Sequence, residues 1–207
     1  VIVVGAAAMM FSSIYLAHGI SIRTTTAVLG TFGGLLITLG VSLWAVDSMR
    51  LTGTASDDSL VLRGEIPGLD MSSILLCGML LAGLGALNDV TITQVSTVWE
   101  LHAANPAMSR RRLFTQGMAV GRDHIASTVY TLAFAYVGTA LPMLMAAALM
   151  QRSTVDLLQV SQISEEIART LTASVGLILA IPLTTVIAAW LAPVAPAKPY
   201  EEHEGIA

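Results

Sequence analysis

Residues 25–46 read TTAVLGTFGGLLITLGVSLWAV, and none of these 22 residues carries a charge. A hydrocarbon core about 30 Å thick needs roughly 20 apolar residues in a helix that rises 1.5 Å per residue. This stretch is therefore long enough to cross a membrane as one helix. It predicts that the chain is an integral membrane protein.

The rest of the chain has the same character. Of its 207 residues, 55% are hydrophobic and 12% are charged, whereas a typical soluble domain carries about 25% charged residues. Apolar runs of suitable length predict five membrane spans, at about residues 1–17, 25–46, 72–92, 124–150 and 169–192. We expect an all-α membrane protein, a bundle of about five transmembrane helices over residues 1–192, followed by a disordered acidic tail over 193–207.

Composition also excludes several classes of function. Ten Lys and Arg residues against 14 Asp and Glu residues leave no basic surface for a nucleic acid. The single cysteine, Cys77, cannot form an internal disulfide. No zinc-protease, P-loop or serine-elbow motif is present, so we expect no enzymatic activity and no cofactor. The lipid bilayer is the expected partner, and homo-oligomerisation is left open.

The first predicted span begins at Val1 and is slightly short. A signal peptide that ends near Ala17 and Gly19 is an alternative interpretation. No basic residue precedes the apolar run, however, and signal peptides have a positive start. We therefore expect the chain to begin inside or just before a helix.

The distribution of Lys and Arg among the connections predicts the orientation. Six lie on one side of the predicted bundle: Arg23, Arg110, Arg111, Arg112, Arg122 and Lys198. Four lie on the other side or at its boundary: Arg50, Arg63, Arg152 and Arg169. The positive-inside rule predicts that Arg110–Arg112 and the C-terminal tail are cytoplasmic.

Polar residues continue the third span. If the helix extends past residue 92, Asp89, Thr93, Ser96 and Glu100 share one face at i, i+4, i+7 and i+11, with Asn88 beside them. Ionisable groups at membrane depth are costly and persist mainly where they pair, line water or function. The alternative interpretation is that the helix has reached the interface by Asn88, so that Asp89 is merely solvated.

A second polar cluster, Arg122, Asp123 and His124, opens the fourth span. The helix dipole favours Asp123 at a helix start, and His124 is of a residue type that relays protons or binds metals. We predict that Asp89, Asp123 and His124 form an ion or proton site, with Arg122 paired to one of the carboxylates. The alternative is an interfacial cap with a snorkelling arginine.

Glycine and proline residues interrupt the last two spans. Gly138 precedes Pro142 in the fourth span, and Gly176 precedes Pro182 in the fifth. Because proline frees a carbonyl group inside a helix, we predict kinks at Pro142 and Pro182 that shape a transport pathway. In the second span, Gly30 and Gly34 have the spacing of a close helix-packing motif.

Three blocks of the sequence resemble the YibE/F family of bacterial multi-pass membrane proteins. They are GALNDVTITQVSTVWEL (85–101), GRDHIASTVYTLAFAYVGTALP (121–142) and SVGLILAIPLTT (174–185), and the likeness runs from His18 to about Ala192. The chain departs from the family pattern at Asn88, where the family has Asp, and at Tyr130, where it has Asn. Family members are usually longer, with a membrane anchor and a non-membrane region upstream.

The resemblance implies a location in the bacterial plasma membrane and a suggested role in transport. We therefore expect a permease of unknown substrate, with ion or proton coupling at the two polar clusters. The alternative is a membrane scaffold or accessory subunit in cell-envelope assembly, with Arg110–Arg112 and the 48–70 loop as docking surfaces.

Overall fold

The computed structural model describes residues 2–149, 156 and 159–194, and all regular structure in this part of the chain is helical. The elements are α1 (Ile2–His18), α2 (Ile22–Ser48), α3 (Asp57–Glu65), α4 (Met71–Ala104), α5 (Arg110–Leu149), α7 (Ser161–Leu191) and the 3-10 turn η1 (Ala192–Val194). The predicted all-α class is confirmed. Most of the predicted tail, from residue 195 onward, lies outside the described residues.

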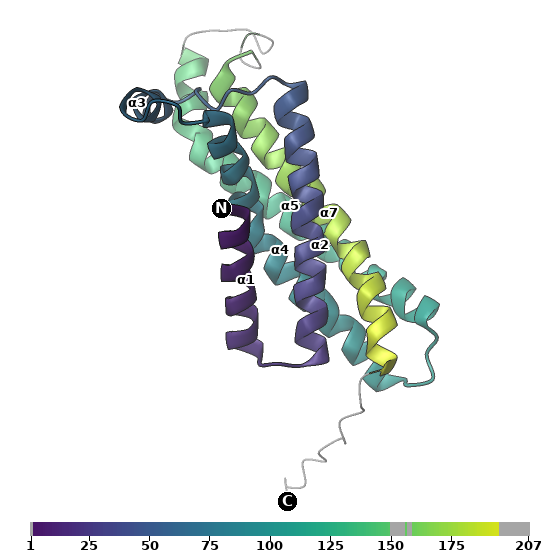
Figure 1. Ribbon diagram of the computed structural model, residues 1–207. Coiled ribbons are helices and arrows are strands. Elements are labelled where there is room, and N and C mark those ends of the chain that lie inside the picture. The colour runs from purple at the N-terminus through teal and green to yellow at the C-terminus, as the bar shows by residue number, and fades with distance from the viewer. Residues whose placement is uncertain (1, 150–155, 157–158, 195–207) are drawn as a thin grey trace, which may run out of the picture.

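Four helices, α2, α4, α5 and α7, are long and apolar enough to cross a membrane. Helix α1 has 17 residues, which corresponds to about 25 Å and is less than the roughly 30 Å of a hydrocarbon core. It lies beside one half of α2 (Figure 1). Four of the predicted spans are thus supported, and a membrane-spanning α1 stays a prediction.

Helices α4 and α5 are longer than the apolar runs within them. Helix α4 continues past residue 92 to Ala104, and α5 begins at Arg110 rather than near residue 124. The expected connection over 93–123 is therefore mostly helical, and only residues 105–109 form the turn. Apolar residues of this extension (Val95, Val98 and Leu113) pack against Ala188 and Ala189 of α7, which explains why the helices continue.

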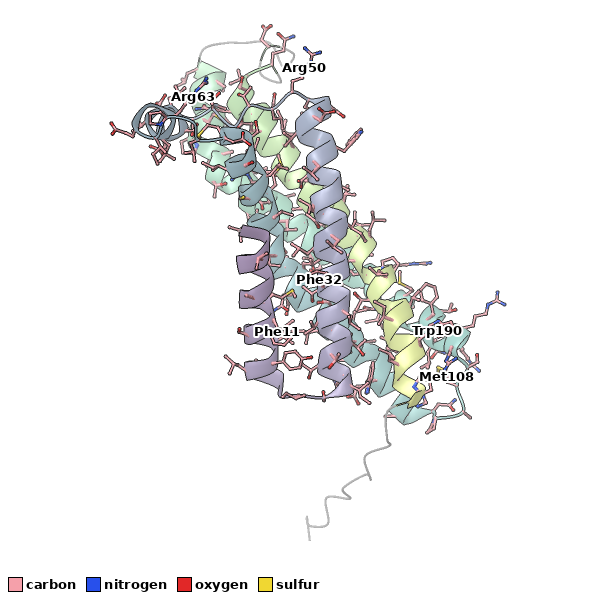
Figure 2. The ribbon with its side chains drawn as sticks, viewed as in Figure 1. Phe11, Phe32, Arg50, Arg63, Met108 and Trp190 are labelled. Atoms are coloured by element: carbon pink, nitrogen blue, oxygen red, sulfur yellow. The ribbon has the colours of Figure 1, made fainter. Side chains whose placement is uncertain are left out.

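The helices form a bundle in which α2 and α7 run antiparallel and α7 crosses α2 obliquely (Figure 1). Helix α3 lies outside the bundle at one end. Arg50 and Arg63 are at that end, and Met108 and Trp190 are at the other (Figure 2). At the latter end, Arg110 lies over the Trp190 ring, 4.9 Å from its centroid. This contact ties the start of α5 to the end of α7.

Glycine residues bring α2 and α7 into close contact. A Cβ atom on Gly30 would lie 2.5 Å from Thr184 Oγ1, and one on Gly34 would lie 2.8 Å from the Ala180 Cβ atom. A Cβ atom on Gly176 of α7 would overlap Thr38 of α2. Gly30 and Gly34 therefore pack helices as predicted, and three contacts along α2 fix its register on α7.

The two prolines lie inside continuous helices. Pro142 is within α5 and Pro182 is within α7, and the helical assignment runs through both positions. Neither helix is broken into two segments. The predicted change of axis direction at each proline stays a prediction.

Candidate functional site

The register of the helices gives the depth of Asp89. Helix α2 carries no charge between Arg23 and Asp47, and the midpoint of this stretch is Leu35. The neighbouring Gly34 faces Leu87 of α4, because its Cβ atom would lie 2.8 Å from Leu87 Cδ1. Asp89 follows Leu87 by two residues, about 3 Å along the helix axis. Asp89 is therefore level with the middle of the uncharged part of α2.

Helix α7 gives the same depth for the second cluster. Its uncharged part, Thr170–Leu191, has Ile181 near its centre. Ile181 shares a core cluster with Val90 of α4, and Ile125 of α5 packs against that cluster. His124 precedes Ile125, so Arg122, Asp123 and His124 lie at this level too. The register favours a position at mid-depth for both polar clusters over one at the interface.

These ionisable side chains face outward from the bundle. Asp89, Arg122 and Asp123 are exposed, and His124 is half-buried. In the part of the chain that the structure describes, ion pairs within 4.0 Å join Arg23 to Glu100 and Glu166 to Arg169. Asp89, Arg122 and Asp123 thus have no ion-pair partner there, and the expected pairing of Arg122 with a carboxylate is not formed.

Asp89, Asp123 and His124 do not form a metal site within one copy. Among the described residues, no group of three His, Cys, Asp or Glu side chains is placed to hold a metal ion. The reason is the helix rotation, since α5 packs against the Val90 side of α4 and Asp89 lies about 100° around the helix from Val90. Roles of the three residues in proton or ion coupling stay predictions.

The other predicted residues of α4 differ in their contacts. Glu100 is exposed and forms an ion pair with Arg23 of α2, with 3.2 Å between Arg23 Nη1 and Glu100 Oε1. The Thr93 hydroxyl donates to the Asp89 backbone carbonyl at 2.8 Å. Asn88 is half-buried, and its Oδ1 atom is buried without a hydrogen-bond partner. Glu100 therefore lies at the same end of the bundle as Arg23, whereas Asn88 lies in the middle of α4.

A buried polar layer lies on the inner side of α4, opposite Asp89. The Gln94 amide donates to the Gly117 carbonyl of α5 at 2.9 Å and to Thr185 Oγ1 of α7 at 2.8 Å. The hydroxyls of Thr31 on α2 and Thr91 on α4 are also hydrogen-bonded to each other. All four side chains are fully buried. This layer connects four helices near the middle of the bundle.

The sequence analysis did not single out Gln94. It lies five residues after Asp89, about 140° around the helix. It is therefore not on the face that carries Asp89, Thr93, Ser96 and Glu100. Gly117 and Gly121 of α5 have the spacing of a helix-packing motif, and a Cβ atom on Gly121 would lie 3.0 Å from Gln94 Oε1. The spacing of the two glycines was the signal available in the sequence, whereas their contact with Gln94 was not.

A cavity of about 580 Å³ lies between α5 and α7, towards the end of the bundle that carries Arg50. Tyr136 and Thr139 of α5 and Glu166 and Arg169 of α7 are among the residues that line it. Arg169 Nε is 3.9 Å from Glu166 Oε2, and both side chains are partly exposed. The two charges compensate each other, so the cavity presents no net charge from this pair.

Comparison with protein families assigns residues 1–194 to the family described as YibE/F-like protein. The match covers nearly all of the chain and confirms the resemblance seen in the three sequence blocks. Neither the comparison with curated proteins nor the comparison with solved structures gives a match.

Proposed function

Because the chain belongs to the YibE/F-like family and has four helices able to cross a membrane, we propose that it is a permease-like membrane protein coupled to protons or small cations. One observation supports this proposal above all others. Asp89, Asp123 and His124 lie level with the middle of α2 and α7. Ionisable groups at that depth cost several kcal/mol, and in membrane proteins they mark ion paths and proton relays.

The proposed pathway runs along the outer side of α4 and α5. Asp89 and Asp123 would hold a cation or proton, and His124 would relay protons, a common role of histidine. The helices α5 and α7 would bend at Pro142 and Pro182 to open the path on either side. No catalytic role is assigned to any residue.

The proposed location is the bacterial plasma membrane, with α1 as a fifth span. Arg23 and Arg110–Arg112 belong to the end of the bundle at which Trp190 lies. By the positive-inside rule this end is cytoplasmic, together with the C-terminal tail. The opposite end, with α3, would face the other side of the membrane.

Proton flux into liposomes tests this proposal. Purified protein is reconstituted with an internal pH-sensitive dye, and a potassium gradient with valinomycin supplies the membrane potential. The proposal expects Asp89→Asn to abolish the flux, whereas Asp58→Asn on the exposed α3 leaves it unchanged. The same assay with sodium, manganese or magnesium gradients tests the coupling to cations. If Asp89→Asn and Asp123→Asn together behave like wild type in all of these gradients, the proposal is wrong.

A membrane scaffold is the second candidate, and the position of α3 favours it. This helix lies outside the bundle, and Leu60, Val61 and Leu62 are 54%, 63% and 42% exposed. Three exposed apolar side chains on a helix of a connecting segment are suited to dock on another envelope protein. A scaffold predicts that a stoichiometric partner co-purifies in mild detergent and is lost when these three residues are replaced by serine. In the liposome assay, wild type and Asp89→Asn would then both show no flux above that of protein-free liposomes.

A further inference from the structure

The cavity between α5 and α7 contains two opposite charges that are not hydrogen-bonded to each other. Arg169 Nε and Glu166 Oε2 are 3.9 Å apart, which is longer than the roughly 2.7–3.2 Å of a hydrogen bond. Arg169 Nε is buried without a hydrogen-bond partner among the described residues. The Arg169 and Glu166 side chains are 32% and 26% exposed. Both groups therefore keep donors or acceptors for a ligand in the cavity.

The surroundings of the pair leave the cavity with balanced charge. A Cβ atom on Gly78 of α4 would lie 3.8 Å from Arg169 Cζ and Nη2, so the guanidinium group packs directly against α4. Glu165, the neighbouring carboxylate of α7, accepts a hydrogen bond from the Gly53 amide at 3.0 Å. Glu165 is not among the described residues that line the cavity. These lining residues therefore include one acid and one base.

Helix α5 supplies the opposite wall of the cavity. Tyr136 and Thr139 bring hydroxyl groups to it, and Tyr136 is close enough to interact electrostatically with both charges of the pair. Ala135, Ala140 and Met143 add apolar surface. The volume of about 580 Å³ falls within the range of sites that hold small molecules, about 300–1,000 Å³.

We propose that this cavity binds a small zwitterion, a molecule that carries one primary ammonium group and one oxyanion. Arg169 takes the oxyanion, because guanidinium donors match carboxylate and phosphate groups, and Glu166 accepts hydrogen bonds from the ammonium group. A simple anion would be repelled by Glu166 and a simple cation by Arg169, whereas a zwitterion satisfies both. Binding here is separate from the proposed ion path at Asp89, so either proposal can fail without the other.

The depth of the pair allows two sources of such a ligand. Arg169 directly precedes Thr170–Leu191, the uncharged part of α7, so the pair lies at the membrane boundary, at the end of the bundle that carries Arg50 (Figure 2). An amino acid reaches this position from water, and its oxyanion is a carboxylate. The ethanolamine headgroup of a phospholipid reaches it from the bilayer, and its oxyanion is a phosphate.

Thermal unfolding of the full chain in nonionic detergent measures the binding, because a ligand of the folded state raises the unfolding temperature. The probes are uncharged α-amino acids and glycerophosphoethanolamine, the soluble form of the headgroup. A shift with amino acids alone supports a free solute, one with glycerophosphoethanolamine alone supports a lipid headgroup, and a shift with both supports the shared chemistry. N-acetylation or amidation of the amino acid, or glycerol phosphate in place of the headgroup, should weaken binding at least about tenfold.

Two substitutions test the roles of the charged side chains. Glu166→Gln and Arg169→Gln should each weaken binding of the zwitterion at least about tenfold. Each should also change the selectivity. Glu166→Gln should no longer distinguish an amino acid from its N-acetylated form, and Arg169→Gln should no longer distinguish it from its amide. A purely structural role would not change selectivity in this way. Glu65→Gln and Arg63→Gln on the exposed α3 are the matched controls.

A substitution that fills the cavity tests the site without altering a charge, and it serves also where a charge variant does not fold. Thr139 is exposed and lines the cavity, so Thr139→Phe should block binding and preserve the fold. Thr131→Phe, at an exposed position of α5 outside the cavity lining, is the control. No shift with either set of probes, equal binding of a zwitterion and its blocked forms by wild type, or undiminished binding in Thr139→Phe would each overturn the proposal.

Discussion

Gln94 of α4 and Thr185 of α7 are joined by a hydrogen bond of 2.8 Å, with both side chains fully buried. The Thr185 hydroxyl donates in turn to the Ile181 carbonyl at 2.6 Å. The same Gln94 amide nitrogen also donates to Gly117 of α5. One side chain therefore connects three helices about one and a half helical turns along α4 from Asp89.

Replacing Gln94 should destabilise the bundle. Gln94→Ala removes both inter-helix hydrogen bonds, and the Gly117 carbonyl then keeps only the backbone bond of its own helix. The expected loss is about 1–3 kcal/mol of unfolding free energy, measured by tryptophan fluorescence during heating in detergent. Gln116→Ala is the control, because Gln116 is half-buried and its side chain has no hydrogen bond among the described residues. Equal effects of the two substitutions would contradict a bridging role for Gln94.

Two glycines of α5 should respond oppositely to alanine. A Cβ atom on Gly121 would lie 2.8 Å from Ile181 Cγ2, whereas one on Gly138 would meet nothing within 4 Å. Gly121→Ala should cost about 1–3 kcal/mol through overpacking, and Gly138→Ala should stabilise by up to about 1 kcal/mol through helix propensity. Thermal unfolding of the two variants measures the difference. A stabilising Gly121→Ala would mean that α5 can move away from α7 without loss.

Gly53 should not tolerate a side chain. Its φ angle is +70°, and a Cβ atom would overlap the Met71 carbonyl oxygen. Its amide also donates to Glu165 Oε1 of α7 at 3.0 Å. Gly68→Ala is the matched control, because φ there is +85° but a Cβ atom meets nothing within 4 Å. Gly53→Ala should lower the unfolding temperature more than Gly68→Ala, which suffers only the backbone strain.

The start of α4 should become less stable in acid. A hydrogen bond from Ser73 is the main cause that lowers the pKa of Asp70, helped by the backbone amides of Ser72 and Ser73 and opposed by burial. A carboxyl with a lowered pKa stabilises the fold above its ordinary pKa, near 4, and loses this effect as pH falls through its lower folded value.

Comparison of wild type with Asp70→Asn measures this effect. Wild type should unfold at the higher temperature near pH 6, and the difference should shrink as the pH falls below about 4. Asp47→Asn is the control, because Asp47 is exposed at the other end of the same connection. If the difference in unfolding temperature between wild type and Asp70→Asn is the same at every pH, the loss of stability in the variant has another cause.

The sequence predicted the helical class and four spans because uncharged runs of about 20 residues are a strong signal. It placed the ends of α4 and α5 poorly. Residues 93–123 are too polar for a membrane span, but all except the turn at 105–109 are helical because they pack on Ala188 and Ala189. The depth of Asp89 was left open for a related reason. It depends on which residue of α2 meets Leu87, and that is a tertiary contact rather than a local pattern.

The same limit applies to the candidate site. Asp89, Asp123 and His124 were identified as residue types, but the rotation of α4 turns Asp89 away from the core that it shares with α5. Gln94 was overlooked because its importance comes from Gly117 and Thr185, which are distant in the chain. The sequence predicts which residue types make up the candidate site, whereas the relative rotation of two helices depends on contacts between distant residues.

The close contact of α2 with α7 also limits how the protein can move. Gly30, Gly34 and Gly176 interlock with side chains of the opposite helix, so a slide of one helix along the other would drive Cβ or hydroxyl atoms into backbone. Beyond Gly121, by contrast, Ala147 is the one described residue of α5 that is buried. We therefore expect any relative motion of the helices to keep α2 and α7 together as a rigid unit and to move the part of α5 beyond Gly121.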